Sequence, residues 1–320
     1  MPNLKFDAEF WAAAGPVIAI RPPGQPRTAQ QLRARLNVGL ASLAKGDLPE
    51  HIVETKHQVT SFDGEQIAVY RYAKQEYASV TKQPAFVYVH GGGLVGGDID
   101  PYSRLLAARC AAEAGVQMFA VEYRLAPEFP YPTPAEDCYA ALRWLSEGAE
   151  GLGLDAARLG FYALSAGGGL AVAASLMARD RGLSPPLAKQ ILIYPMLDDR
   201  TRAQRGDPLC DFLTWTNVQN QLGWNAYLGE GRPGSDDVPA YAAPGRVEDV
   251  AGLPSTYIDV GGLDLFCTES VAFAGRLSKA NVQMELHVYP GLPHIFDLYA
   301  PDIELTRRAR ENRLRAARSL

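Results

Sequence analysis

One serine of this sequence stands in a local pattern that could make it a nucleophile. Ser165 lies in Ala163-Leu164-Ser165-Ala166-Gly167, directly after a strand-like apolar run and directly before a helix of small residues. A tight strand-to-helix turn needs small residues two positions on either side of the serine, so its usual pattern is G-x-S-x-G. Gly167 fits, and Ala163 departs by one methyl group. The pattern predicts a nucleophile, with a simple helix cap as the alternative.

A glycine-rich stretch could supply the matching anion site. His90-Gly91-Gly92-Gly93 follows the apolar run 85–89 and should therefore lie at the carboxyl edge of the same sheet. Consecutive glycines leave their amide hydrogens unshielded, and an HGGG element forms the oxyanion loop of lipases and esterases. A flexible turn or a phosphate loop is the alternative, although the Lys-Ser/Thr of a P-loop is missing.

The general base would have to be one of two histidines that follow the serine. In enzymes with this serine turn the chain order is Ser, then Asp or Glu, then His. His287 lies inside the alternating run 285–289, where a packed or solvent-facing ring is the simpler explanation. His294 follows Pro290-Gly291-Leu292-Pro293, a loop that could carry it over the sheet edge. We therefore predict His294 as the base.

Asp264 is the best-placed acid. It follows the apolar run 256–260, whereas Asp259 lies inside that run and Asp198 and Asp199 belong to a separate segment.

In the predicted mechanism His294 takes the serine proton and Asp264 orients the imidazole. The backbone amides of Gly92, Gly93 and Ala166 hold the oxyanion, water releases the acyl group, and neither a metal nor an organic cofactor is required.

Strand-like and helix-like segments alternate along the chain and would position these groups. A hairpin is expected over 54–73 around Asp63-Gly64. Short apolar runs typical of buried parallel strands follow at 85–89, 117–122, 159–163, 190–194, 256–260 and 285–289. Helical spacing appears between them, for example at 135–146. The alternation predicts an α/β protein with a mostly parallel, twisted sheet flanked by helices on both faces.

Two regions depart from this alternation. The first fifty residues carry helical stretches near 7–14 and 28–45 with no strand between them, and the segment after Met196 carries its own helix near 214–228. The last helix, 303–320, contains six arginines. We interpret its basic side as a solvated helix face, the alternative being a site for an anionic partner.

Composition limits the class of protein. The 320 residues are 47% hydrophobic and 21% charged with a formal net charge of -5, as expected for one globular enzyme without affinity for nucleic acid. No apolar run reaches the roughly 18 residues of a membrane span, and the N-terminus lacks the pattern of a secretory signal. The four cysteines form no C-x-x-C pair and are interpreted as reduced thiols: Cys110, Cys138, Cys210 and Cys267. We therefore expect no metal site, no membrane partner and a cytoplasmic location.

Four motifs in order give the chain a family resemblance. They are His90-Gly91-Gly92-Gly93, Tyr123-Arg124-Leu125-Ala126-Pro127-Glu128, Ser165-Ala166-Gly167-Gly168 and Pro290-Gly291-Leu292-Pro293-His294. Over residues 50 to 300 the chain resembles the bacterial hormone-sensitive-lipase-like esterases of the α/β-hydrolase fold. It departs from that family at Ala163 and Leu164 before the nucleophile, and Asp264 stands in an incomplete version of the D-P-L-x-D-E stretch.

The resemblance implies a carboxylesterase that acts on small-molecule esters with short to medium acyl chains. It also implies a helical cap made of residues 1–50 and the insertion 196–235, over a hydrolase core formed by 51–195 and 236–320. An apolar acyl pocket could be lined by Leu94, Leu164, Phe212, Leu213 and Trp215, unless these side chains only pack the cap onto the core.

Other functions and assemblies remain open at this point. An amidase would use the same triad, and a peptidase of this fold usually resembles different loop motifs. A non-catalytic receptor resembling the plant gibberellin receptors would lack the histidine that His294 provides. The edge strand expected at 285–289 could pair with its twin in a homodimer.

Overall fold

A single mixed sheet organises the chain. The structure is a computed structural model, and it describes residues 4–20, 24–43 and 46–320. Within these residues eight strands form one sheet in the order β1-β2-β4-β3-β5-β6-β7-β8. The first two pairings, β1 with β2 and β2 with β4, are antiparallel, and every later pairing is parallel. This confirms the α/β-hydrolase fold.

The strands lie where the apolar runs predict them. The hairpin consists of β1 (Ile52–Thr60) and β2 (Gln66–Lys74), which turn at Asp63-Gly64. The parallel strands are β3 (Gln83–Val89), β4 (Gln117–Val121), β5 (Leu154–Leu164), β6 (Lys189–Ile193), β7 (Ser255–Gly261) and β8 (Met284–Tyr289). β4 is buried along its whole length, because helices cover both faces of the sheet.

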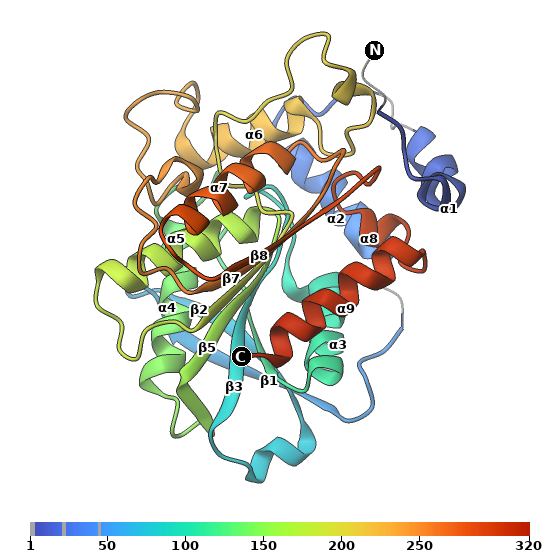
Figure 1. Cartoon of the computed structure of the whole chain (residues 1–320). Coiled ribbons are helices and arrows are strands. Elements are labelled where there is room, and N and C mark those ends of the chain that lie inside the picture. The colour runs from blue at the N-terminus through green and yellow to red at the C-terminus, as the bar shows by residue number, and fades with distance from the viewer. Residues whose placement is uncertain (1–3, 21–23, 44–45) are drawn as a thin grey trace.

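Helices form a layer on each face of the sheet (Figure 1). One layer contains α4 (Thr133–Glu147), α5 (Ala166–Asp180) and α7 (Cys267–Lys279). The other contains α3 (Arg104–Ala114) and α9 (Glu304–Arg318), which contact each other. Each layer buries its own hydrophobic cluster against the sheet.

Small residues let the central helix α5 pack directly against the segment that follows β6. Every residue from Ala166 to Ala178 is buried. A Cβ on Gly168 would lie 2.6 Å from the Cβ of Pro195, and one on Gly169 would lie 2.3 Å from the carbonyl oxygen of Met196. Larger side chains would push the helix, and the serine that precedes it, away from the strand ends.

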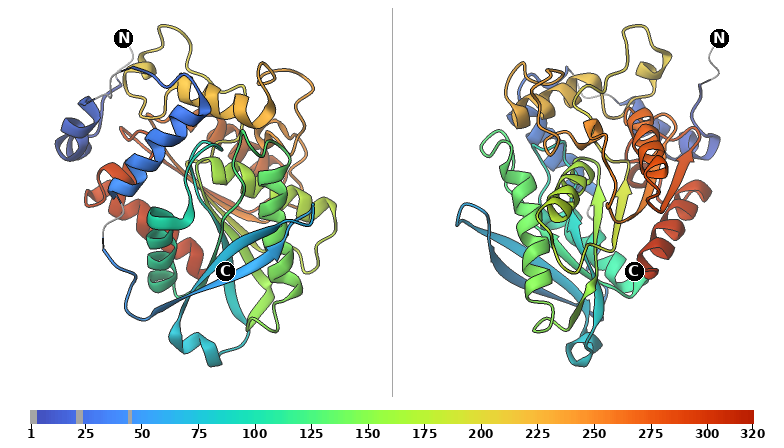
Figure 2. Two further views of the ribbon diagram at one scale, coloured as in Figure 1. Left: turned by 180° about the vertical axis from the view of Figure 1, so that it is seen from behind. Right: turned by 60° about the vertical axis from the view of Figure 1, so that its left-hand side comes forward.

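The remaining helices lie toward the carboxyl ends of the parallel strands. α2 (Ala29–Leu43) contacts α6 (Asn217–Leu228) above the sheet, and α1 (Ala8–Ala19) lies at the side of the molecule against the short helix α8 (Phe296–Tyr299) (Figures 1 and 2). The helices expected near 7–14, 28–45 and 214–228 are therefore present, although Ala44 and Lys45 lie outside the described residues. Within the described part of the chain, no helix combines the length and apolar character of a membrane span.

The interpretation of the last helix needs one correction. Five of its six arginines are exposed, as expected, but Arg313 is buried. Its guanidinium pairs with Asp259 of β7 and with Asp297 of α8. The basic helix is therefore not only a solvated surface, because one of its cations lies inside the protein.

Candidate active site

The three residues predicted as a triad form one hydrogen-bonded chain. Ser165 Oγ lies 2.9 Å from His294 Nε2, and His294 Nδ1 lies 2.6 Å from Asp264 Oδ2. All three side chains are buried. They come from the turns that follow β5, β7 and β8, so the parallel strands bring together residues separated by up to 129 positions. The arrangement can pass a proton from the serine to the imidazole.

The backbone at Ser165 is a sharp turn. Ser165 has φ 52° and ψ −120°, and its amide donates a 2.9 Å hydrogen bond to the carbonyl oxygen of Ile193 on β6. Gly167 is required here, because a Cβ at that position would lie 2.4 Å from the carbonyl oxygens of Val89 and His90. Ala163 sits fully buried in β5, so the strand accommodates its extra methyl group.

The glycine loop adopts backbone angles that only glycine tolerates well. Gly92 has φ +133°, and a Cβ there would lie 1.9 Å from the carbonyl oxygen of Gly96. Gly93 has φ +60°, and a Cβ there would lie 2.3 Å from Cη2 of Trp215. The side chain of Trp215, from the segment before α6, therefore covers the glycine loop directly. The first three glycines of this loop line the same cavity as Ser165 and His294.

His90 holds the start of this loop. Its Nδ1 donates a 2.7 Å hydrogen bond to the carbonyl oxygen of Gly91, and Tyr123 donates to the carbonyl oxygen of His90 over 2.9 Å. The two rings are stacked with centroids 4.2 Å apart. Burial lowers the pKa of His90 to about 4, so the imidazole is neutral at neutral pH. His90 thus acts as a neutral hydrogen-bond donor that shapes the loop.

Aromatic rings surround the imidazole of His294. Phe266 and Tyr194 contact it edge-on, with ring centroids at 5.0 and 4.8 Å, and Trp215 lies at 6.3 Å. Thr214 donates a 2.8 Å hydrogen bond to the carbonyl oxygen of His294. The ring is therefore fixed by packing on several sides as well as by its two polar partners.

Asp264 is fixed although its surrounding motif is incomplete. Its Oδ1 accepts a 2.9 Å hydrogen bond from the amide of Phe266, which leaves Oδ2 for His294. Cys267, at the start of α7, is half-buried, and burial raises the pKa of its thiol to about 11. This thiol therefore stays protonated beside the acid, in line with the expectation of a reduced thiol.

A narrow, mostly apolar cavity opens at the serine. It spans about 560 Å³ including its mouth, but only about 70 Å³ is wide enough for the centre of a water molecule. Its lining comes from α2, the glycine loop, the turn before α3, the strand ends, the segment before α6 and the region from the loop after β8 into α8: Leu36, Leu40, Tyr88, Gly91, Gly92, Gly93, Tyr102, Ser103, Leu164, Ser165, Tyr194, Trp215, His294, Ile295 and Leu298.

The structure divides the residues predicted for the pocket. Leu164 and Trp215 line the cavity. Leu94 and Leu213 belong to the hydrophobic core, as Trp215 also does, but they do not line this cavity. The ring of Phe212 contacts Phe6 of the N-terminal segment with centroids 5.0 Å apart.

Sequence reasoning did not identify the leucines of α2 or the tyrosines of the cavity. Leu36 and Leu40 are four residues apart on a helix, a spacing that marks one face. Tyr194 follows β6 directly, at the same edge of the sheet as the serine. Both signals are readable in the sequence, but neither shows that the residue faces the cavity.

Helix α2 also contacts the far end of the glycine loop. Asn37 Oδ1 accepts a 3.0 Å hydrogen bond from the amide of Gly97, and Leu36 packs against Gly96. The N-terminal region therefore lies directly against the loop that borders the candidate site, rather than standing apart from it.

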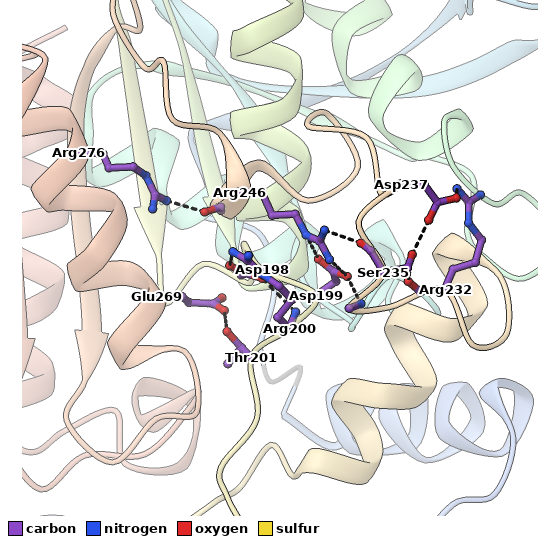
Figure 3. Close-up of polar contacts among 12 residues, drawn as sticks. Asp198, Asp199, Arg200, Thr201, Arg232, Ser235, Asp237, Arg246, Glu269 and Arg276 are labelled. Carbon is purple, nitrogen blue, oxygen red and sulfur yellow. Dashed lines mark hydrogen bonds and ion pairs between the residues drawn. The ribbon is translucent and has the colours of Figure 1, made fainter.

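A buried ion pair joins the two ends of the segment between β6 and β7 to each other (Figure 3). Arg246 forms two 2.7 Å hydrogen bonds with the carboxylate of Asp199, whose side chain is fully buried. The carboxylate also accepts from the amide of Gly234, and Arg246 donates to the carbonyl oxygen of Ser235. One ion pair thus fixes both ends of a long irregular segment.

Glu269 of α7 fixes the start of that segment. Its carboxyl group accepts a 2.6 Å hydrogen bond from the amide of Leu197. It accepts another from the hydroxyl of Thr201 (Figure 3). Burial raises the pKa of Glu269 well above its ordinary value, and these two hydrogen bonds oppose that shift. Because Glu269 lies five residues after Asp264, the same stretch carries both the candidate acid and this anchor.

No cluster of metal-ligating side chains is present in the described ranges. The four cysteines are free thiols; Cys110 and Cys138 are buried, and Cys210 and Cys267 are half-buried.

Comparisons with known proteins agree on one family. A family model described as alpha/beta hydrolase fold matches residues 86–298. The esterase LipI of Mycobacterium tuberculosis is 31% identical, covering 99% of this chain and 98% of its own. The ethyl acetate hydrolase of Pseudomonas putida is 32% identical, covering 90% of this chain and 88% of its own. Among solved structures, a bacterial heroin esterase is similar with a TM-score of 0.88 and 33% identity, covering 98% of both chains.

Proposed function

Because this chain belongs to the alpha/beta hydrolase family, we propose that its Ser165, His294 and Asp264 are the catalytic triad of an ester hydrolase. The chain is a serine carboxylesterase, since its relatives over nearly full length are esterases. The observation that carries the residue assignment is the continuous hydrogen-bonded chain from Ser165 Oγ through His294 to Asp264.

In the proposed acylation step, His294 removes the hydroxyl proton as Ser165 Oγ attacks the ester carbonyl carbon. Asp264 accepts a hydrogen bond from Nδ1, which leaves Nε2 free to take that proton. The tetrahedral intermediate collapses when His294 returns the proton to the departing alcohol. Water then attacks the acyl-enzyme with the same imidazole as its base and releases the carboxylic acid.

The proposed oxyanion site consists of the amides of Gly92, Gly93 and Ala166. Gly92 and Gly93 border the cavity beside Ser165, and Ala166 begins α5 immediately after it. The first amides of a helix have no partner within the helix, so they can donate to a developing negative charge. No cofactor takes part in this proposal.

We propose short acyl esters as the preferred substrates. The cavity is narrow, and Trp215, Leu164 and the leucines of α2 restrict it with apolar walls. Its apolar lining suits an acyl chain, and its small volume does not suit a long one. One relative is named for the hydrolysis of ethyl acetate.

Three further parts of the expected organisation are proposals as well. We propose that residues 1–50 and 196–235 act as a cap over the core, which the contact of α2 with α6 supports. The free thiols fit a reducing compartment such as the cytoplasm. β8 is an edge strand and could pair with its twin in a homodimer, and a concentration-independent monomer mass in solution would refute this pairing.

The test is hydrolysis of p-nitrophenyl acetate, butyrate, octanoate and palmitate, with a matched aryl amide, by the wild type and by Ser165→Ala. We expect cleavage of the short esters and a loss of at least roughly 10³-fold in kcat for the variant. Activity that survives in Ser165→Ala would refute the triad. A wild type that cleaves the amide as well as the ester would instead favour an amidase.

A further inference from the structure

A buried ionic cluster lies behind the candidate histidine, and the mechanism above gives it no role. Arg313 of α9 donates to both carboxylate oxygens of Asp259, from Nε over 2.6 Å and from Nη2 over 2.9 Å. Its Nη1 donates to Asp297 over 2.5 Å. The side chains of Arg313 and Asp259 are 6% and 0% exposed. We name Asp259, Asp297 and Arg313 the rear cluster.

The rear cluster reaches the imidazole through Tyr194. The hydroxyl of Tyr194 donates a 3.1 Å hydrogen bond to Asp297, and its ring contacts His294 edge-on with centroids 4.8 Å apart. The amide of Tyr194 donates over 2.6 Å to the carbonyl oxygen of Asp259. Arg313 lies 5.6 Å from the centroid of the same ring. Tyr194 is therefore held at its hydroxyl, its ring and its backbone.

The rear cluster also holds the turn that carries His294. Asp297 is only three residues after His294, and Ile295 between them has the left-handed φ of 52°. A β-branched residue is unfavourable in that conformation, so the turn needs contacts that keep it in place. The pair between Asp297 and Arg313 ties this turn to α9, and α9 itself packs on the sheet.

The two carboxylates of the cluster keep its arginine charged in the interior. Burial by itself lowers the pKa of Arg313, but the attraction of Asp259 and Asp297 outweighs it and keeps the pKa well above the ordinary value. The guanidinium is therefore charged, and its planar fork can bond two carboxylates at once. A lysine would keep the charge but lose this geometry.

We infer that Arg313 is a positioning residue, which through Asp297 and Tyr194 holds the His294 imidazole in line with Ser165. Among the described residues, the hydrogen bonds of Arg313 go to Asp259 and Asp297 and not to His294 or Ser165, so its effect passes through the turn and the tyrosine ring. The inference rests on the proposed catalytic role of His294. It assigns a function to the one arginine of the last helix that is buried.

The experiment compares Asp297→Asn, Tyr194→Phe, Arg313→Lys and Arg313→Met with the wild type on p-nitrophenyl acetate. Arg310→Met is the matched control, because Arg310 lies on the same helix and pairs with Glu113 at the surface. Displacing a catalytic group by about 1 Å can cost about 10²-fold in rate. We expect kcat to fall by about 10²-fold in Asp297→Asn and Arg313→Met and by less in Tyr194→Phe and Arg313→Lys. The KM of each variant should stay within about twofold of the wild-type value.

A second readout separates positioning from general stability. The rate of inactivation by a p-nitrophenyl phosphonate requires the serine and the histidine but no deacylation, so it should fall in parallel with kcat. If Arg313→Met fails to fold, Asp297→Asn and Tyr194→Phe still decide the question, because each removes one hydrogen-bonding link and keeps the side chain's shape.

Each outcome has a defined meaning. The inference is overturned if folded Asp297→Asn and Tyr194→Phe keep wild-type kcat and phosphonate reactivity, or if all variants lose melting temperature but not kcat. Loss of activity in Ser165→Ala and His294→Ala together with wild-type kcat in Asp297→Asn would refute only this inference. Activity that survives in His294→Ala would refute the proposed mechanism itself.

Discussion

Arg33 Nε, in the N-terminal helix α2, donates a 2.5 Å hydrogen bond to the carbonyl oxygen of Val95, in the loop that continues from the three glycines. The same guanidinium donates over 2.7 Å to the carbonyl oxygen of Ala126 and pairs with Glu128. The YRLAPE stretch and the glycine loop, which are distant in sequence, are thus joined by one side chain of the proposed cap. The N-terminal region is therefore part of the framework around the proposed oxyanion site.

Replacing Arg33 should lower kcat strongly and lower the free energy of unfolding only slightly. In Arg33→Met the carbonyl oxygens of Val95 and Ala126 lose their donor and the glycine loop gains freedom, so we expect kcat on p-nitrophenyl acetate to fall roughly tenfold. The ion pair with Glu128 is half exposed and should contribute little to stability. Arg35→Met is the control, because Arg35 donates to the carbonyl oxygen of Gly24 instead. An unchanged kcat would show that the loop is rigid without α2.

Shortening Trp215 should change the acyl preference. In Trp215→Leu the cavity widens above Gly93, so kcat/KM for the octanoate ester should rise relative to the acetate ester by about tenfold or more. Steady-state kinetics on the p-nitrophenyl series measure the ratio. Trp11→Leu is a suitable control, since Trp11 is 48% exposed on α1 and lines no part of this cavity. A chain-length profile identical to that of the wild type would place the acyl chain elsewhere.

Glu269 should make stability depend on pH. Its folded pKa is raised by burial above the ordinary 4.5, so the native state keeps a proton that the unfolded state releases. The protonated carboxyl group of Glu269 therefore contributes to stability fully below about pH 4.5, and this contribution is lost as the pH rises through the folded pKa. Glu269→Gln keeps the shape without the titration. The melting temperature of the variant minus that of the wild type should therefore increase from pH 5 to pH 8, and a constant difference would contradict the assignment.

The ion pair between Asp199 and Arg246 should matter far more than its exposed neighbour. Asp199→Asn leaves the guanidinium of Arg246 buried without its counter-charge, which typically costs about 3 kcal/mol or more of unfolding free energy. Arg200→Met removes the adjacent pair with Asp198, whose arginine is 54% exposed, and should cost about 1 kcal/mol or less. Urea unfolding measures both. Equal losses would show that the buried pair has no special role in holding the segment.

The sequence predicted the parts of the molecule that depend on local pattern. Continuous apolar runs located the parallel strands, because a strand covered on both faces excludes polar residues. The turn after each strand then placed Ser165, Asp264 and His294 at one edge, since parallel strands all end on the same side. Chain order of the motifs, rather than any one of them, distinguished the family from other proteins with a glycine-rich turn.

Features that depend on packing between distant segments could not be predicted. Arg313 resembles its five exposed neighbours in sequence, and its carboxylate partners lie 54 and 16 residues away, so no local pattern marks it as buried. The contribution of Leu36 and Leu40 to the cavity depends in the same way on how α2 docks. Hydrophobicity also could not decide whether Leu94 and Leu213 line the pocket or pack the cap onto the core, because apolar character alone does not distinguish a cavity wall from the protein interior.

The contact between Trp215 and Gly93 restricts the order in which this enzyme could change. While the indole is in place, any side chain at position 93 meets it within 2.3 Å, so every substitution there is blocked by sterics as well as by backbone angle. A smaller residue at position 215 removes the steric clash, and the unfavourable backbone angle at position 93 is then the remaining obstacle. Mutations at these two positions are therefore not independent, because a side chain at position 93 has space only after position 215 has become smaller.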